Sequence, residues 1–260
     1  MQRYWILFFS ICAIPYWSYA DVVITPVDYS QGGEQLQGWL AYDNTTQNVR
    51  PGVVIFPEWW GLTDYPKHRA EELAKLGYVA FAADMYGKGV TTDDAGQATS
   101  LSGRFYNDPD LMRARAQAGL DQLKNDPRVD ARRMAAIGYC FGGTCALELA
   151  RSGADLAGTI SFHGGLKTTR PDDAKNIKGK ILVITGGDDA FISPAQVNAF
   201  EDEMRTAGVD WQVVVYGGAH HAFTNPDADR HGIPNIKYDP EADHRSWAEM
   251  QAFFGEIFGQ

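Results

Sequence analysis

The chain has 260 residues, of which 45% are hydrophobic and 22% are charged, and its formal net charge is −10. This composition is typical of a globular protein with a large core, in one large domain or two small ones, and it excludes a disordered chain. The acidic balance argues against nucleic acid or an anionic membrane surface as a partner, and only three cysteines exclude a disulfide framework.

The first twenty residues have the pattern of a secretory signal peptide. Arg3 is their only charged residue, an apolar run spans 4–15, and Ser18 and Ala20 provide the small residues that precede a cleavage site. A membrane anchor is the alternative, but the run is shorter than the roughly 18 to 20 residues that cross a bilayer. We therefore expect an exported protein, periplasmic or secreted, whose folded domain comprises residues 21–260.

Short apolar runs alternate with helical patterns along the rest of the chain. Alternating residues predict an antiparallel hairpin at a sheet edge, at 21–27 and 35–42. Nearly continuous apolar runs predict parallel strands buried on both faces, at 52–56, 78–83, 133–138, 156–162, 180–185 and 211–216. Helical patterns lie between or after these strands, at 67–76, 111–123, 143–150, 195–207 and 242–258. The alternation predicts a doubly wound, mostly parallel α/β sheet with helices on both faces, in a single domain.

The residues that follow the strands are candidate site residues, because ligands of such sheets bind at the carboxyl ends of the strands. The strand at 133–138 continues as GYCFGG, which is the G-x-nucleophile-x-G pattern with Cys140 in the place of the more usual serine. Gly138 and Gly142 relieve crowding at a sharp strand-to-helix turn. At a helix N-terminus, free N–H groups and the helix dipole favour a thiolate. Cys140 is therefore a candidate nucleophile, and a buried core cysteine is the alternative.

The other cysteine of the folded domain is Cys145, five positions further along the predicted helix. Its Cα atom is then roughly 8 Å or more from that of Cys140, which is beyond disulfide reach. We expect Cys145 to pack in the core and Cys140 to remain free.

A thiol nucleophile needs a base, and the base needs an acid that orients it. Asp188 and Asp189 follow the strand at 180–185, and His220 and His221 follow the next strand. Alone, such residues are more often solvated or capping groups. In the order nucleophile, acid, histidine, however, Cys140, Asp189 and His221 fit a catalytic triad.

Two further groups follow the strand at 52–56. Glu58 precedes two tryptophans, and its carboxylate could accept the thiol proton and keep the resting site neutral until substrate displaces it. A surface charge is the alternative interpretation. The backbone N–H groups of Trp59 and Phe141 are placed to form an oxyanion hole.

With these residues in view, the sequence resembles the dienelactone hydrolase family of α/β hydrolases over nearly all of residues 21–260. The matching segments come in order, namely VVIFPEWWGLTDYPKHRAEELAKLGYVAFAADMYG, DPRVDARRMAAIGYCFGG, TGGDDAFISPAQV, YGGAHHAF and SWAEMQAFFGEIFG. The resemblance implies that Cys140 is the nucleophile, His221 the general base and Asp189 the acid that orients it. It also implies that Glu58 gates the thiol, that Phe141 and Trp59 supply the oxyanion N–H groups, and that Tyr86 lines the site.

The sequence departs from that family at two substrate-binding positions. Where the member that opens dienelactones has arginines for the substrate carboxylate, this chain has Lys88 and Asn225. Lysine keeps the charge without the planar fork of arginine, and asparagine has no charge. The departure argues against dienelactone itself as the substrate. Three more aromatic residues, Trp60, Phe191 and Phe223, are expected to form the walls of an acyl pocket with Trp59.

The resulting hypothesis is a hydrolase without cofactor that cleaves small carboxylic esters or lactones. It implies no nucleic-acid partner and no stable membrane insertion after signal cleavage. A binding protein that uses the same pocket without turnover is one alternative, and a thioesterase or peptidase with the same triad is another. A metal site at His220, His221 and His231 has no supporting ligand spacing.

Overall fold

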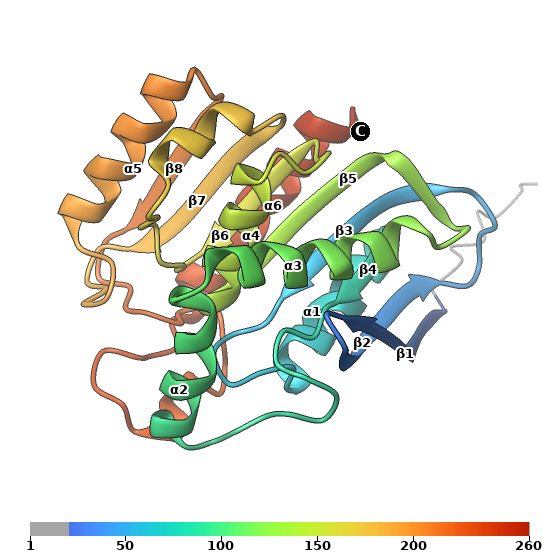
Figure 1. The fold of residues 1–260 in the computed structure, drawn as a ribbon, viewed down its shortest axis with the longest axis horizontal. Coiled ribbons are helices and arrows are strands. Elements are labelled where there is room, and N and C mark those ends of the chain that lie inside the picture. The colour runs from blue at the N-terminus through green and yellow to red at the C-terminus, as the bar shows by residue number, and fades with distance from the viewer. Residues whose placement is uncertain (1–20, 260) are drawn as a thin grey trace, which may run out of the picture.

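One eight-stranded sheet runs through the computed structural model, which describes residues 21–259 (Figure 1). In chain order its strands are β1 (Val22–Gln31), β2 (Glu34–Asp43), β3 (Arg50–Phe56), β4 (Val79–Ala82), β5 (Val129–Tyr139), β6 (Gly158–Phe162), β7 (Lys180–Gly186) and β8 (Trp211–Tyr216). Their order in the sheet is β1-β2-β4-β3-β5-β6-β7-β8. Strands β3 to β8 are parallel, and β2 is antiparallel to both of its neighbours. The predicted, mostly parallel α/β sheet is thereby confirmed.

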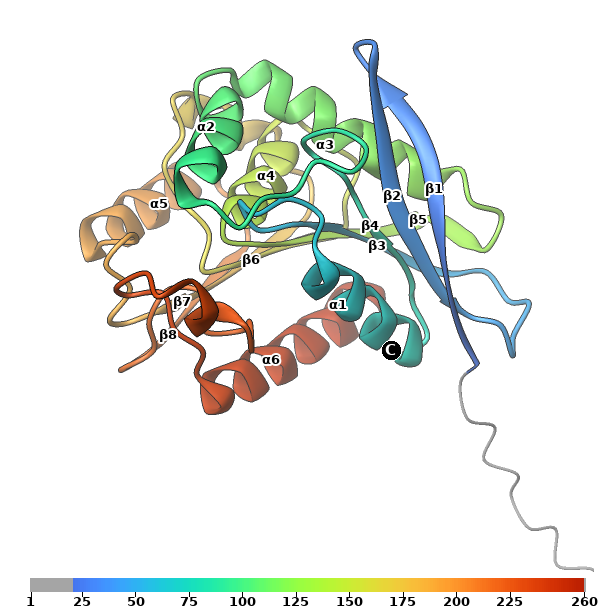
Figure 2. The same ribbon diagram turned by 90° about the horizontal axis from the view of Figure 1, so that it is seen from below.

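Helices cover both faces of the sheet. They are α1 (Asp64–Lys75), α2 (Ala95–Tyr106), α3 (Pro109–Lys124), α4 (Phe141–Arg151), α5 (Pro194–Ala207) and α6 (Pro240–Phe258), with short 3₁₀ helices η1 (Pro171–Asn176) and η2 (Ala228–His231). Figure 2 shows α1 and α6 on one side of the sheet and α3 and α4 on the other. This is the doubly wound arrangement that the alternation of patterns predicts.

Successive residues of β5 face opposite layers of the core. Ala135, Ile137 and Tyr139 pack in the hydrophobic cluster that includes residues of α1 and α6, whereas Met134 and Ala136 pack in the cluster that includes residues of α3 and α4. Because side chains alternate between the faces of a strand, a strand covered on both faces needs apolar residues at every position. Burial of the parallel strands on both faces therefore explains the continuous apolar runs of the sequence.

The N-terminal hairpin lies at the edge of the sheet, as predicted. Gly32 and Gly33 connect β1 to β2 with φ angles of +59° and +88°, which glycine adopts without strain. Both strands are longer than the alternating pattern indicated, because pairing extends to the turn, where Gln31 lies opposite Glu34.

Both ends of the described chain lie near the amino ends of the parallel strands. Val22 pairs with Asp43, at the end of β2 that lies beside the start of β4. The ring of Phe258, the last residue of α6, lies 5.9 Å from that of Tyr78, which directly precedes β4. The carboxyl ends of the strands, where catalytic groups are expected, are at the opposite edge.

Helix α2 is an element that the sequence pattern did not predict. Its sequence, AGQATSLSGRFY, contains Gly, Ser and Thr, which are weak helix formers. The Asp94 side chain caps it by accepting a hydrogen bond from the Gln97 N–H at 2.8 Å. The helix buries only Ala98, Ser102 and Phe105, so it has no long apolar face for a sequence pattern to reveal.

The predicted signal peptide, residues 1–20, lies outside the described residues, and export therefore stays a prediction. Within residues 21–259, none of the helices combines the length and the apolar character that a bilayer crossing requires.

Candidate active site

Cys140 lies at a strained turn between β5 and α4. Its φ and ψ angles are +54° and −118°, a conformation that non-glycine residues rarely adopt. A Cβ atom on Gly138 would lie 1.9 Å from the Gly142 carbonyl oxygen, and one on Gly142 would lie 2.1 Å from the Phe56 carbonyl oxygen. Both glycines are therefore required by close backbone contacts, and the turn has the geometry of a nucleophile elbow.

The two cysteines of the described chain differ as expected. Cys140 is partly exposed, Cys145 is buried, and both are free. Burial raises the pKa of the Cys145 thiol well above its usual value, so Cys145 stays protonated and inert.

Asp189 and His221 meet at the carboxyl ends of β7 and β8. The Nδ1 atom of His221 lies 2.8 Å from Oδ2 of Asp189, and both residues are buried. The other carboxylate oxygen of Asp189 accepts hydrogen bonds from the N–H groups of Phe191 at 2.8 Å and Ile192 at 3.1 Å. The carboxylate is thus fixed by the loop, and it orients the imidazole with the Nε2 atom free to act on a neighbour.

The charges around His221 favour its protonated form. Burial opposes the imidazolium, but the charge of the Cys140 sulfur and hydrogen bonds with Asp189 and Cys140 outweigh it and raise the pKa of His221 to about 10. The imidazole of His221 and the sulfur of Cys140 therefore interact electrostatically in this site.

The neighbouring residues Asp188 and His220 are turned away from this pair. Nδ1 of His220 lies 3.2 Å from the Asp188 carbonyl oxygen, in an exposed contact between the two loops.

The predicted oxyanion hole uses the backbone N–H groups of Phe141, which directly follows Cys140, and of Trp59, which lines the same cavity. Phe141 is the first residue of α4, where N–H groups have no partner within the helix. Among residues 21–259, neither N–H group donates to a backbone or side-chain acceptor. Within the described residues, both groups thus lack a hydrogen-bond partner, which the predicted oxyanion hole requires.

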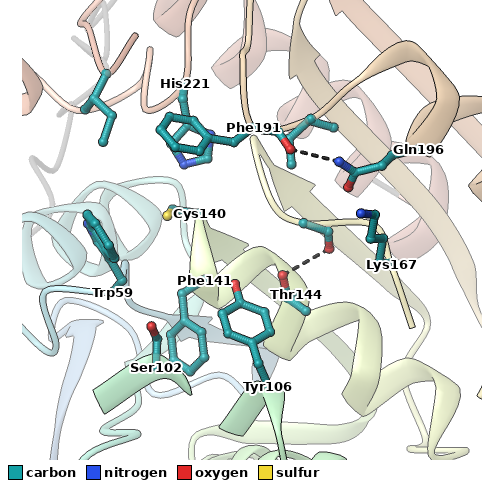
Figure 3. Close-up of a pocket in the computed structure, with 13 residues that line it drawn as sticks. Trp59, Ser102, Tyr106, Cys140, Phe141, Thr144, Lys167, Phe191, Gln196 and His221 are labelled. Atoms are coloured by element: carbon teal, nitrogen blue, oxygen red, sulfur yellow. Dashed lines mark hydrogen bonds between the residues drawn. The ribbon is translucent and has the colours of Figure 1, made fainter. Parts of the chain in front are cut away.

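A cavity of about 360 Å³ opens over Cys140 (Figure 3). Its lining is mostly apolar, with Trp59, Tyr106, Phe141, Phe191, Ile192 and Ile236, and its polar groups are Ser102, Thr144, Lys167, Gln196 and His221. The segment between β8 and α6 contributes both His221 and Ile236 to this cavity.

Four residues expected around the substrate lie elsewhere. Tyr86 is buried behind the cavity, where its hydroxyl donates to the Trp59 carbonyl oxygen at 3.0 Å. Lys88 points away, with Nζ 2.7 Å from an Asp28 carboxylate oxygen. Neither residue lines the cavity over Cys140, and partners elsewhere satisfy their polar groups.

The aromatic residues Trp60 and Phe223, also predicted to form the acyl pocket, do not line the cavity over Cys140. The Trp60 ring stacks on that of His231 at 3.9 Å between centroids and borders a second cavity, of about 630 Å³. Phe223 is fully buried and packs edge-on against His163 at 5.2 Å. Of the predicted aromatic walls, Trp59 and Phe191 line the cavity over Cys140.

Glu58 is buried beside the second cavity. It borders the second cavity and accepts a hydrogen bond from the Asn225 side-chain amide at 2.6 Å. Burial raises the pKa of Glu58 to about 7, although the Asn225 hydrogen bond and the charge of His221 partly oppose the rise. Asn225 therefore binds the carboxyl of Glu58 instead of facing the cavity over Cys140.

The raised pKa of Glu58 predicts a pH-dependent contribution to stability. Because the folded state binds this proton more tightly than the unfolded state, the carboxyl destabilises the fold progressively as pH rises from 4.5 to about 7. We expect Glu58→Gln, whose amide oxygen can still accept from Asn225, to gain up to about 3 kcal/mol relative to wild type across this window. Urea unfolding at pH 4.5 and pH 8 measures the difference, and an equal difference at both values would contradict the assignment.

His163 is a residue of the site that the sequence interpretation missed. Its Nδ1 atom accepts a hydrogen bond from the Cys140 N–H at 3.1 Å, and its Nε2 atom lies 2.8 Å from Thr224 Oγ1. Burial and the charge of His221 keep the pKa of His163 well below its usual value, so the ring is neutral and Nδ1 can accept. His163 directly follows β6, and the same strand-end argument that led to Asp189 applies to it.

The parallel sheet, the strained elbow after β5, and the acid and histidine after the last two strands define the class of this protein, which is an α/β hydrolase. The family model of the dienelactone hydrolase family matches residues 38–258. The chain belongs to this family.

Several relatives share nearly the whole length of the chain. It is 33% identical over 237 residues to Protein usf of Aquifex pyrophilus, which covers 88% of this chain and 97% of that protein. It is 30% identical to a protein of Aquifex aeolicus that is provisionally named carboxymethylenebutenolidase, over 88% of this chain and 96% of that one. The crystal structure of P91, a dienelactone hydrolase-like promiscuous phosphotriesterase from metagenomic libraries, is similar with a TM-score of 0.87 and 43% identity, covering 91% of this chain and 98% of that one.

Proposed function

We propose that this protein hydrolyses carboxylic esters or lactones with Cys140 as the nucleophile. The observation that carries the proposal is the strained Cys140, beside a buried Asp189–His221 pair and under a largely apolar cavity. Membership of the dienelactone hydrolase family supports the same class of reaction.

The proposed reaction has two halves. The thiol proton moves to His221, and the sulfur attacks the substrate carbonyl carbon while the N–H groups of Phe141 and Trp59 stabilise the oxyanion. Collapse of this intermediate breaks the bond to the alcohol oxygen, which takes the proton from His221. Water then attacks the thioester with His221 as base, and the acid and the free thiol are released. Asp189 holds the imidazole in position throughout.

Glu58 completes the proposed set. Because its pKa is raised to about 7, its carboxyl can hold or release a proton near neutral pH. The effect of His221 on that pKa indicates that the two groups are electrostatically coupled. We assign Glu58 the role of holding a proton in the resting enzyme, so that the site stays neutral until the thiol proton moves to His221 on substrate binding.

The test is hydrolysis of 4-nitrophenyl butyrate by residues 21–260, followed by mass spectrometry of the rapidly quenched enzyme. We expect turnover above the buffer rate and a butyryl group on the peptide that contains Cys140. A binding protein would give neither turnover nor adduct, and an adduct on another residue would contradict the assigned nucleophile.

A second candidate reaction is the hydrolysis of phosphotriesters. It is favoured by the 43% identity to P91, which is described as a promiscuous phosphotriesterase. An elbow thiolate can attack phosphorus as well as carbon. Release of 4-nitrophenol from paraoxon, lost in Cys140→Ala, would support it, and no release above the buffer rate would exclude it.

We also propose that the protein is exported, on the pattern of residues 1–20. Expression of the full chain in a bacterium should yield a mature protein that begins at Asp21. N-terminal sequencing of the purified protein tests this, and retention of Met1 would contradict it.

A further inference from the structure

The cavity over Cys140 has one permanently charged side chain in its lining. Lys167, on the segment that follows β6, is the only lysine or arginine there, and none of the lining residues is acidic. In Figure 3 its ammonium group lies near Gln196 and Thr144, and Trp59 lies on the other side of Cys140. The cavity is thus positively charged, in a chain with a net charge of −10.

The polar groups beside Lys167 are occupied by contacts within the protein. The Gln196 side-chain amide donates to the Phe191 carbonyl oxygen at 2.9 Å, and the Thr144 hydroxyl donates to the Gly165 carbonyl oxygen at 3.0 Å. The ammonium of Lys167, in contrast, forms no ion pair and no hydrogen bond with any of residues 21–259. Its three donors remain available to a ligand.

The nearby acidic groups are neutralised by arginines. Glu148 borders a neighbouring hollow together with Lys167, but it is paired with Arg113 at 2.8 Å and Arg151 at 3.1 Å. Arg170, three positions beyond Lys167, is paired with Asp110 at 2.6 Å. Lys167 is therefore the cation on this segment whose charge is not balanced within the described structure.

We propose that Lys167 determines specificity by binding an anionic group of the substrate, most simply a carboxylate, while the scissile carbonyl lies at Cys140. The inference rests on the proposed ester hydrolysis and adds a substrate class to it. Because the rest of the lining is largely apolar, the substrate has an apolar body that joins the ester or lactone group to the anion. Lys167 is exposed at the edge of the cavity, so its contact with the anion is a solvent-screened ion pair of modest strength.

Two pairs of esters test the proposal in the full folded protein. The first pair places the anion on the acyl side, 4-nitrophenyl hemiglutarate against 4-nitrophenyl valerate, and the second places it on the alcohol side, 4-acetoxybenzoate against phenyl acetate. The readout is the preference, meaning the ratio of kcat/KM for the anionic over the neutral ester. We expect Lys167→Gln to lower the preference about twofold to fivefold in one pair, and Lys167→Arg to restore most of it. The matched control is Lys178→Gln, an exposed lysine paired with Asp155 at 3.7 Å, which should leave both ratios unchanged.

A second readout does not depend on ester hydrolysis. The rates at which 3-maleimidopropionic acid and N-propylmaleimide alkylate Cys140 compare an anionic with a neutral reagent of similar length. We expect Lys167→Gln to lower their ratio severalfold, and high salt to do the same in wild type. Unchanged ratios in both ester pairs and in alkylation would overturn the role of Lys167. If no ester is hydrolysed but Lys167→Gln still lowers the ratio of alkylation rates, the proposed function is overturned and the anion site remains supported.

Discussion

Replacing Cys140 with alanine is expected to lower kcat/KM for 4-nitrophenyl butyrate by about 10⁴-fold or more. The substitution removes the sulfur that forms the acyl intermediate, while the methyl side chain keeps the strained turn without adding atoms to it. The N–H groups of Phe141 and Trp59 and the apolar cavity remain, so a small residual rate above the buffer reaction is expected.

The matched control is Cys145→Ala, five residues further along the chain in α4. Cys145 is fully buried and takes no part in the proposed reaction. We expect activity within twofold of wild type and a loss of about 1 kcal/mol in the free energy of unfolding. If Cys145→Ala lost activity while Cys140→Ala retained it, the assigned nucleophile would be wrong.

Asp189→Asn is the second substitution with a large expected effect, about 10³-fold to 10⁴-fold in kcat. In the wild type, one carboxylate oxygen accepts from Phe191 and Ile192, and the other accepts from His221. An asparagine that keeps its oxygen toward the two loop N–H groups must turn its amide nitrogen toward Nδ1 of His221. That forces the imidazole proton onto Nε2, which then cannot take the thiol proton.

The adjacent residue gives the control for this effect. Asp188 is exposed, and only its carbonyl oxygen meets His220. Asp188→Asn removes the same charge one position away and should change kcat by less than twofold. Steady-state rates between pH 6 and 9 separate the two variants, and equal losses in both would indicate a general charge effect instead of an oriented histidine.

The positions of Cys140, Asp189 and His221 could be predicted because one topological rule governs them. In a parallel sheet the residues after the strands gather at one edge, whatever their distance in sequence. The Asp189–His221 hydrogen bond joins two such positions that are 32 residues apart. The need for glycine on both sides of Cys140 could also be predicted from the sequence, because a Cβ atom at Gly138 or Gly142 would clash with backbone atoms of the turn and of β3.

The direction of individual side chains could not be predicted in this way. Trp59 and Trp60 are neighbours, yet the first lines the cavity over Cys140 and the second stacks on His231. Lys88 and Lys167 both follow strands, but only the second reaches the cavity, because Asp28 pairs with the first. Such outcomes depend on which partner lies nearby in space, and a single sequence carries no signal for that.

The placement of the chain ends has a practical consequence. Val22 and Phe258 both lie at the amino ends of the parallel strands, whereas the cavity opens at their carboxyl ends. A linker or a fused partner attached at either end would therefore lie at the edge of the sheet opposite the cavity, and the cavity would face away from it. The same geometry suits immobilisation on a solid support, where substrate would reach Cys140 from the bulk solution without crossing the attachment layer.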